Sequence, residues 1–131
     1  MKVRIAMAVA VTLLLSGCKA IDGTYQPSCV AFAGSEIRLE DGRFVWDKFT
    51  DQVVVDEQGN KVDQFPDFPR QGSYSVSNDA VTLSPDSGSP ETFYLLRDKG
   101  AVYLLTNEEK STYDATGERP RCALQRQSAG T

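Results

Sequence analysis

Apolar and polar residues alternate along most of this chain, and short turn-forming pairs interrupt the alternation. The stretch EIRLEDGRFVW (residues 36–46) shows the pattern on both sides of Asp41-Gly42. Successive side chains of a β-strand point to opposite faces, and an Asp-Gly pair between two alternating runs is a strong β-hairpin signal. The alternation therefore predicts a hairpin here and favours folds made of antiparallel strands.

The same pattern predicts three more hairpins and a last strand. They are residues 73–84 with a turn at Asn78-Asp79, 92–106 with a turn at Asp98-Lys99-Gly100, 52–65 with a turn at Gln58-Gly59-Asn60, and the last strand in 119–127. Helical spacing of apolar residues is absent, and one helical turn is expected at Glu108–Tyr113. We expect an all-β domain of about 7–9 short strands, a small antiparallel up-and-down β-barrel, with a β-sandwich as the alternative.

The N-terminal segment has the layout of a secretory signal peptide. Lys2 and Arg4 precede an apolar run, Ile5–Leu15, that only Thr12 interrupts. A charged start, an apolar stretch of this length and small residues after it are typical of a signal, and the run is too short for a comfortable membrane span. A buried N-terminal helix is the alternative, but the run shows no polar face at helical spacing.

Leu15-Ser16-Gly17-Cys18 resembles the lipobox of bacterial lipoproteins. The resemblance implies cleavage before Cys18, a diacylglycerol thioether on its sulfur and acylation, for example by palmitate, of its new amino group. Each buried CH₂ contributes about 0.8 kcal/mol, so more than one acyl chain gives a stable anchor. Lys19, in place of an aspartate, implies delivery to the outer membrane with the protein on the periplasmic face.

The lipobox divides the chain into four parts. They are the signal peptide 1–17, a lipidated tether 18–22, a β-barrel domain 23–127 and a flexible tail 128–131. Two cysteines remain in the domain, Cys29 and Cys122, and an even pair in an extracytoplasmic protein is first read as a disulfide. A zinc site is the alternative, but the chain has no histidine to complete four ligands. A disulfide would bring the first and last strands together, as barrel closure requires.

The layout of the mature part loosely resembles the small lipocalin-like barrels of bacterial envelope lipoproteins. The copper-responsive stress lipoprotein among them has a Cys-x-x-Cys motif, whereas the matching region here reads QPSCVAF with Cys29 alone. The resemblance therefore implies a lipid-anchored barrel but supports no copper or redox role.

Charge and motif content argue against several classes of function. The full chain has a formal charge of −4, and Lys2 and Arg4 are the only charged residues of the signal, so the mature part has a charge of −6. An acidic domain disfavours nucleic acid and anionic lipid as partners. The absence of histidine excludes Ser-His-Asp and Cys-His catalysis, and the chain has no Gly-rich phosphate loop.

The acidic residues of the domain offer little for catalysis or metal binding. Four of them could in principle do acid–base chemistry, but they lie at positions expected to form a solvated face: Asp47, Asp51, Asp56 and Glu57. Asp56, Asn60 and Asp63 fail the spacing of a calcium loop, and a hairpin turn explains them without a metal. We expect no enzyme activity, no metal and no cofactor.

Residues 63–72, DQFPDFPRQG, form the most unusual stretch, because two prolines block regular strand pairing. Two readings are open for it. Phe65, Asp67, Phe68 and Arg70 could form a binding loop, since rigid rings lose little entropy on binding. The favoured reading is that both rings fold down and plug one end of the barrel.

Arg119 and Arg121 form a basic pair in an otherwise acidic domain, and this pair could hold an anion. Surface pairing with Glu118 or Asp114 is the favoured interpretation.

These observations leave three functional hypotheses. The leading one is a membrane-anchored, non-enzymatic lipoprotein that binds an envelope protein or maintains the envelope. One alternative is a lysozyme-inhibitor-type protein binder, since an acidic domain suits a basic enzyme. The other is a carrier of a small apolar ligand, which requires a hollow barrel. Four bulky residues are expected to fill the interior instead: Trp46, Phe44, Tyr74 and Leu83.

Overall fold

A computed structural model describes residues 20–128. The expectations for the signal peptide 1–17, for lipidation at Cys18 and for the last residues of the tail, 129–131, lie outside the described residues. Everything that follows on structure concerns residues 20–128.

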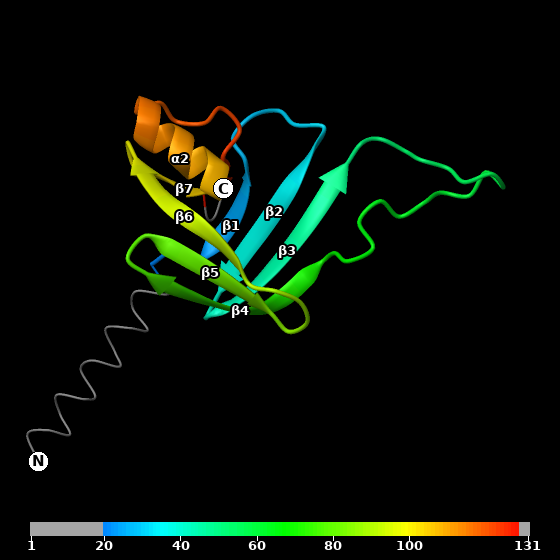
Figure 1. Ribbon diagram of the computed structural model, residues 1–131, viewed down its shortest axis with the longest axis horizontal. Coiled ribbons are helices and arrows are strands. Elements are labelled where there is room, and N and C mark those ends of the chain that lie inside the picture. The colour runs from blue at the N-terminus through cyan, green and yellow to red at the C-terminus, as the bar shows by residue number, and fades with distance from the viewer. Residues whose placement is uncertain (1–19, 129–131) are drawn as a thin grey trace, which may run out of the picture.

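Eight antiparallel strands close into a barrel, and one helix lies between the last two of them (Figure 1). The strands are β1 (Gly23–Pro27), β2 (Ala33–Glu40), β3 (Arg43–Thr50), β4 (Arg70–Ser77), β5 (Ala80–Pro85), β6 (Glu91–Asp98), β7 (Ala101–Leu105) and β8 (Leu124–Arg126), and the helix is α2 (Asn107–Thr116). Each strand pairs with the next, and β1 also pairs with β8. The expected up-and-down barrel is confirmed in preference to the sandwich.

Turn residues set the register of the predicted hairpins. Asp41 and Gly42 have φ values of 50° and 79°, and Lys99 and Gly100 have values of 51° and 85°. Positive φ at both central residues is what a two-residue type I′ turn requires. Asn78, in the turn between β4 and β5, also has a positive φ of 56°. Three of the four predicted hairpins are thus confirmed.

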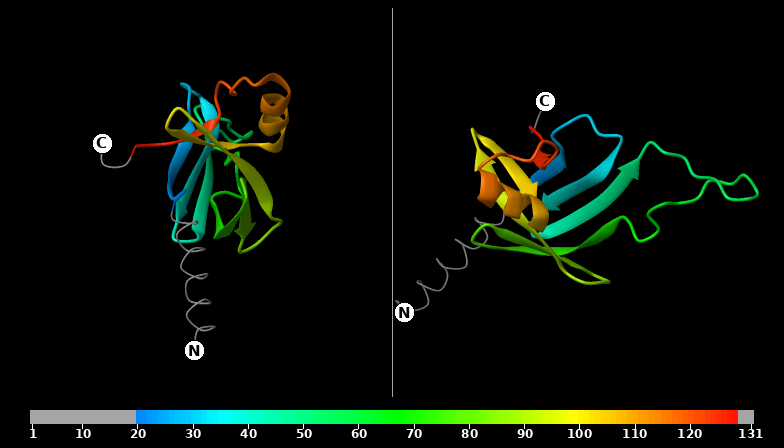
Figure 2. Two further views of the ribbon diagram at one scale, coloured as in Figure 1. Left: turned by 90° about the vertical axis from the view of Figure 1, so that its left-hand side faces the viewer. Right: turned by 45° about the horizontal axis from the view of Figure 1, so that its top comes forward.

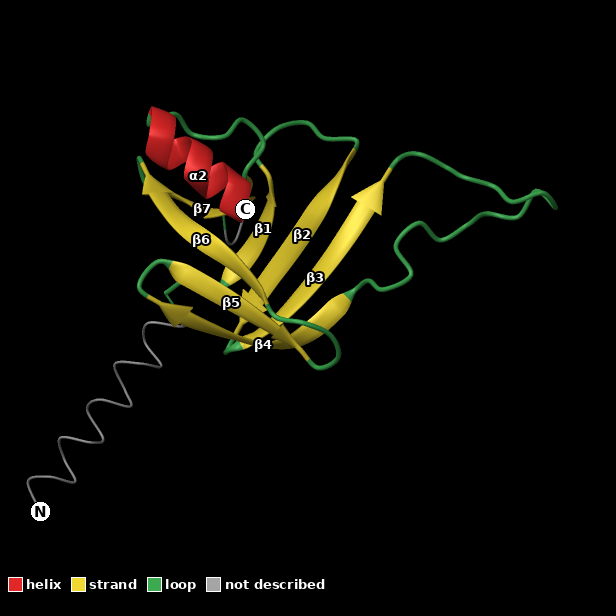
Figure 3. Ribbon diagram, in the orientation of Figure 1, coloured by secondary structure: helices red, strands yellow, loops and turns green. Residues whose placement is uncertain are grey.

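The fourth predicted hairpin is wrong as a pair of strands. Residues 51–69, called the arm below, project from the barrel as a loop between β3 and β4 (Figure 3). A single bridge joins Val55 to Lys61, and the Val62 amide donates to the Val54 carbonyl at 2.8 Å. A hairpin without neighbouring strands or a packed face is only marginally stable, which explains why pairing stops after one bridge.

Bulky side chains fill the barrel. Phe44, Trp46, Tyr74 and Leu83 are all buried, as expected, and Tyr25 has no exposed surface. The other members of the main core cluster are Ile21, Ile37, Leu39, Val81, Phe93, Leu95, Val102 and Leu104. Small barrels of eight strands have an interior just wide enough for side chains, and here those side chains occupy it.

Helix α2 is longer than the single turn expected at Glu108–Tyr113. The Thr106 hydroxyl accepts from the Glu109 amide and the Glu109 carboxylate accepts from the Thr106 amide, which makes a capping box. None of its residues is buried, so the helix has no apolar stripe for periodicity to detect. The Thr-x-x-Glu spacing was the available signal.

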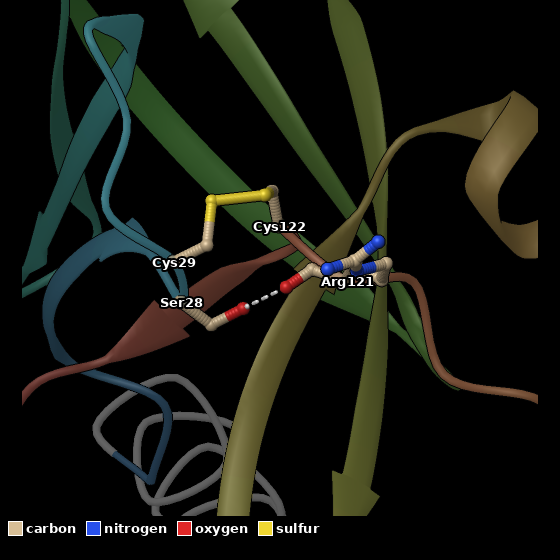
Figure 4. Close-up of a disulfide and its surroundings, with 4 residues drawn as sticks. All are labelled: Ser28, Cys29, Arg121 and Cys122. Carbon is tan, nitrogen blue, oxygen red and sulfur yellow. Dashed lines mark hydrogen bonds between the residues drawn. A yellow bond between two sulfur atoms is a disulfide. The ribbon is translucent and has the colours of Figure 1, made fainter.

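The predicted disulfide between Cys29 and Cys122 is present, with Cα atoms 5.0 Å apart (Figure 4). It joins the segment after β1 to the segment before β8. The Ser28 hydroxyl beside it donates to the Arg121 carbonyl at 3.1 Å, and the Ser28 amide donates to the Ala123 carbonyl at 3.0 Å. The bond therefore fastens the seam where the first and last strands meet.

The two ends of the barrel carry different segments. At one end, called the entry end, residues 20–22 lead into β1. There the Asp22 carboxylate accepts from the Asp41 amide at 3.0 Å, and Arg126 donates to the Ala20 carbonyl at 2.8 Å. The opposite end, called the arm end, carries the loop after β1 and the arm, which projects away from the barrel (Figures 1 and 2). The first described residues and the arm thus lie at opposite ends.

Tyr25 stabilises the entry end from inside the core. Its hydroxyl donates to the Ile21 carbonyl at 2.7 Å, and this bond fixes the segment that leads into β1. Burial raises the pKa of Tyr25 from 10.0 to about 12, although Arg126 and Arg97 act in the opposite direction. The phenol therefore stays neutral in the folded protein at pH values where it ionises in the unfolded chain.

We expect the stability of the protein to fall as pH rises from about 10 to about 12, because the folded pKa of Tyr25 lies above the unfolded one. The contribution is complete below pH 10 and is lost as pH approaches 12, which amounts to roughly 2–3 kcal/mol. Urea titrations at several pH values would measure it. Tyr25→Phe should lose markedly less stability over this range, and an identical slope in both proteins would contradict the assignment.

Candidate binding surface

Phe68 lies at the base of the arm and packs inward. It is half-buried against the main core cluster, and its ring meets Trp46 edge-on at 5.1 Å between centroids. Trp46 in turn meets Phe93 edge-on at 5.6 Å. The position of Phe68 therefore agrees with the interpretation in which the ring folds down and plugs one end of the barrel.

Two cations flank these rings. Lys48 Nζ lies 4.9 Å from the centre of the Phe68 ring and 6.0 Å from that of Phe65, and the Arg70 guanidinium lies 4.8 Å from Phe68. Each cation–π contact contributes about 0.5–1 kcal/mol at a partly exposed site. The structure thus brings Phe65, Phe68 and Arg70 together and adds Lys48, which the sequence did not single out. Asp67 is exposed.

A surface hollow of about 510 Å³ adjoins this base. It is lined by Asp67, Pro69, Arg70, Gln71, Asp86, Ser87 and Gly88. Asp86 is already paired with Arg43 at 3.1 Å. The hollow is open and mixes one cation with two carboxylates, so it provides no concentrated charge for a small ion.

Trp46 has a buried indole Nε1 with no hydrogen-bond partner among residues 20–128. A buried donor without a partner costs about 1–3 kcal/mol. The burial of the large indole ring in contact with Phe68 and Phe93 offsets this cost.

The arm exposes apolar side chains at positions predicted to form a strand pair. Four valines are 66%, 44%, 55% and 44% exposed: Val53, Val54, Val55 and Val62. On the neighbouring loop, Val30 and Phe32 are 91% and 70% exposed, and the Phe32 carbonyl accepts from the Asp51 amide at 2.8 Å. These six residues belong to two segments that the Asp51–Phe32 hydrogen bond joins at their bases, and we call them the apolar surface. Exposed apolar area that gathers in one region marks interaction sites more often than isolated exposed residues do.

The same arm is strongly acidic. Residues 51–69 contain five carboxylates and one basic residue: Asp51, Asp56, Glu57, Asp63 and Asp67, with Lys61. All five carboxylates are exposed, which confirms the expected solvated face for the three predicted within the arm, as for Asp47 on β3. Asp56 also accepts from the amides of Gln58 and Asn60, both at 2.9 Å, and so closes the turn at the tip.

Arg119, one residue of the basic pair Arg119 and Arg121, contacts partners other than those expected. Arg119 contacts Asp98 at 3.4 Å and lies 4.9 Å from the centre of the Tyr103 ring. Asp114 pairs with Lys110, four residues earlier on α2, at 2.7 Å. Surface pairing was the right interpretation, but Glu118 and Asp114 were the wrong partners for Arg119.

The described residues show no arrangement for metal chemistry. Within residues 20–128, no group of three or more His, Cys, Asp or Glu side chains is placed to hold a metal ion. No helix in that part of the chain combines the length and apolar character needed to cross a membrane.

No protein-family model matches this chain, and no curated protein or solved structure shows significant similarity to it.

Proposed function

We propose that the protein is a lipid-anchored, non-enzymatic binding module of the bacterial outer membrane that presents its arm to a protein in the periplasm. The anchor would be Cys18 within the lipobox-like stretch 15–18. The domain would act through its surface, since bulky side chains such as Tyr25 and Phe44 fill the barrel. The same filling counts against the carrier of an apolar ligand.

One observation carries this proposal: the entry end and the arm end lie on opposite sides of the barrel (Figure 1). Cys18 precedes Ala20, the first described residue, by two positions. Two residues span at most about 7 Å, so a lipid on Cys18 would hold the entry end close to the membrane. The arm would then point away from the lipid, where it can meet a protein partner.

The anchor is tested with Cys18→Ser in cells given an alkyne analogue of palmitate. Wild-type protein should carry the label and sediment with membranes, whereas Cys18→Ser should carry no label, because it lacks the thiol that accepts the lipid. Cys29→Ser, matched in chemistry, should keep the label. Label on Cys18→Ser, or a wild-type protein without label, would contradict the anchor.

A lysozyme-inhibitor-type role is the second candidate, and the acidic arm is the observation that favours it. Unchanged activity of c-type lysozyme at a micromolar concentration of this protein would remove it.

A further inference from the structure

The arm combines two properties that a loop of a monomeric protein rarely shows together. Its valines, and Val30 and Phe32 on the loop after β1, keep between 44% and 91% of their surface exposed. The arm also carries five exposed carboxylates, and Lys61 is the only basic residue within residues 51–69. Protein–protein interfaces combine apolar side chains, which become buried, with polar side chains at the rim.

Hydrogen bonds between residues of the arm also order it partly in the protein without a partner. The Asp56 amide donates to the Asn60 carbonyl at 2.9 Å, and the Gln64 side chain donates to the Gln52 carbonyl at 2.8 Å across the two legs. The Asp56 carboxylate closes the tip. A segment held in one shape loses less conformational entropy on binding, so the arm suits insertion into a partner.

Charge decides between the possible occupants of this surface. A second copy of the chain would bring another acidic arm to the same place, and an anionic membrane would repel it. A groove with an apolar floor and lysine or arginine side chains at its rim would satisfy both the valines and the carboxylates.

We propose that residues 51–69, with Val30 and Phe32, dock into an apolar groove with a basic rim on another globular protein. The idea deepens the proposed function, because it names the surface and the chemistry of the partner. It does not depend on the lipid, since the surface lies at the arm end of the barrel, opposite the entry end (Figure 1).

The partner is identified by photo-crosslinking in the cells that make the full-length protein. A benzoylphenylalanine replaces Val55 in the arm or, as a control, the exposed Thr112 on α2. We expect a protein adduct from the Val55 position, and we expect the yield of that adduct to be at least about tenfold lower from the Thr112 position. No adduct from Val55, or an adduct with a second copy or with lipid, would overturn the proposal.

The crosslinked protein is then purified and its Kd measured against the full chain in detergent. Asp51→Lys with Glu57→Lys should weaken binding at least about tenfold, and raising NaCl from about 50 to about 300 mM should weaken wild-type binding. These two positions are chosen because Asp56 and Asp63 accept backbone hydrogen bonds within the arm. Glu91→Lys with Glu118→Lys makes the same change in net charge on exposed sites outside the arm and should leave Kd within about twofold.

An unchanged or tighter Kd in the arm variant, or an equal loss in the control variant, would overturn the assignment of the surface. The failure of the lipid experiment would leave this result intact, because Kd is measured without a membrane. Conversely, a failed binding experiment would leave the labelling of Cys18 unaffected. The two claims can thus fail separately.

Discussion

Replacing Cys29 and Cys122 by serine is expected to lower the free energy of unfolding by about 4.5 kcal/mol. The disulfide closes a loop across a sequence separation of 93 residues, and the chain-entropy model assigns such a loop a large restriction of the unfolded chain. The bond also holds the β1–β8 seam, where only three residue pairs are in register. Urea unfolding of the double variant and of the wild type would measure the difference.

Ser28→Ala is the control for this prediction. It removes the hydrogen bond from the Ser28 hydroxyl to the Arg121 carbonyl beside the disulfide and should cost no more than about 1 kcal/mol. Reducing the wild type with a thiol should reproduce the loss seen in the double variant. A double variant within about 1 kcal/mol of the wild type would show that the seam is held by strand pairing alone.

Gly72→Ala is the second large effect that we expect. An added Cβ on Gly72 would lie 2.1 Å from the Ser84 carbonyl oxygen and 2.8 Å from the Pro85 Cα, both on the paired strand β5. These are backbone atoms and can move only if the β4–β5 pairing shifts. We expect a loss of about 3 kcal/mol or more, at the upper end for overpacking, read from urea unfolding of purified protein.

Gly34→Ala is the matched control, on β2. Its Cβ would lie 3.1 Å from Pro27 Cγ and 3.3 Å from Phe49 Cζ, which are side-chain atoms that can give way. We expect a cost of no more than about 1 kcal/mol. Equal losses in the two variants would contradict the close approach of the strands at Gly72.

Local turn chemistry made most of the barrel predictable. Asp41-Gly42 and Lys99-Gly100 both adopt positive φ values, which the glycine of each pair takes without a steric cost, and the flanking runs pair in the expected register. The two cysteines independently predicted that the first and last strands meet, because a disulfide between Cys29 and Cys122 was expected. Helix α2 was underestimated because it buries no side chain and therefore shows no apolar period.

The arm was mispredicted because its residues resemble a strand pair. Val53–Val55 favour strand conformation, and a turn does form between them and Lys61, where the Gly59 amide donates to the Asp56 carbonyl. Whether such a hairpin extends depends on neighbours, and strand neighbours are a property of the whole fold rather than of the segment. For the same reason, the contact of Lys48 with Phe68 could not be predicted, since it joins β3 to a loop twenty residues later.

The most direct test of a binding arm is the affinity of a variant with Val53, Val55 and Val62 all changed to serine for the crosslinked partner. These side chains are exposed in the free protein, so the melting temperature should stay the same. Burying each of them in a groove contributes roughly 1 kcal/mol, and we therefore expect Kd to rise about 100-fold. An unchanged Kd in a variant that melts like the wild type would contradict the central claim.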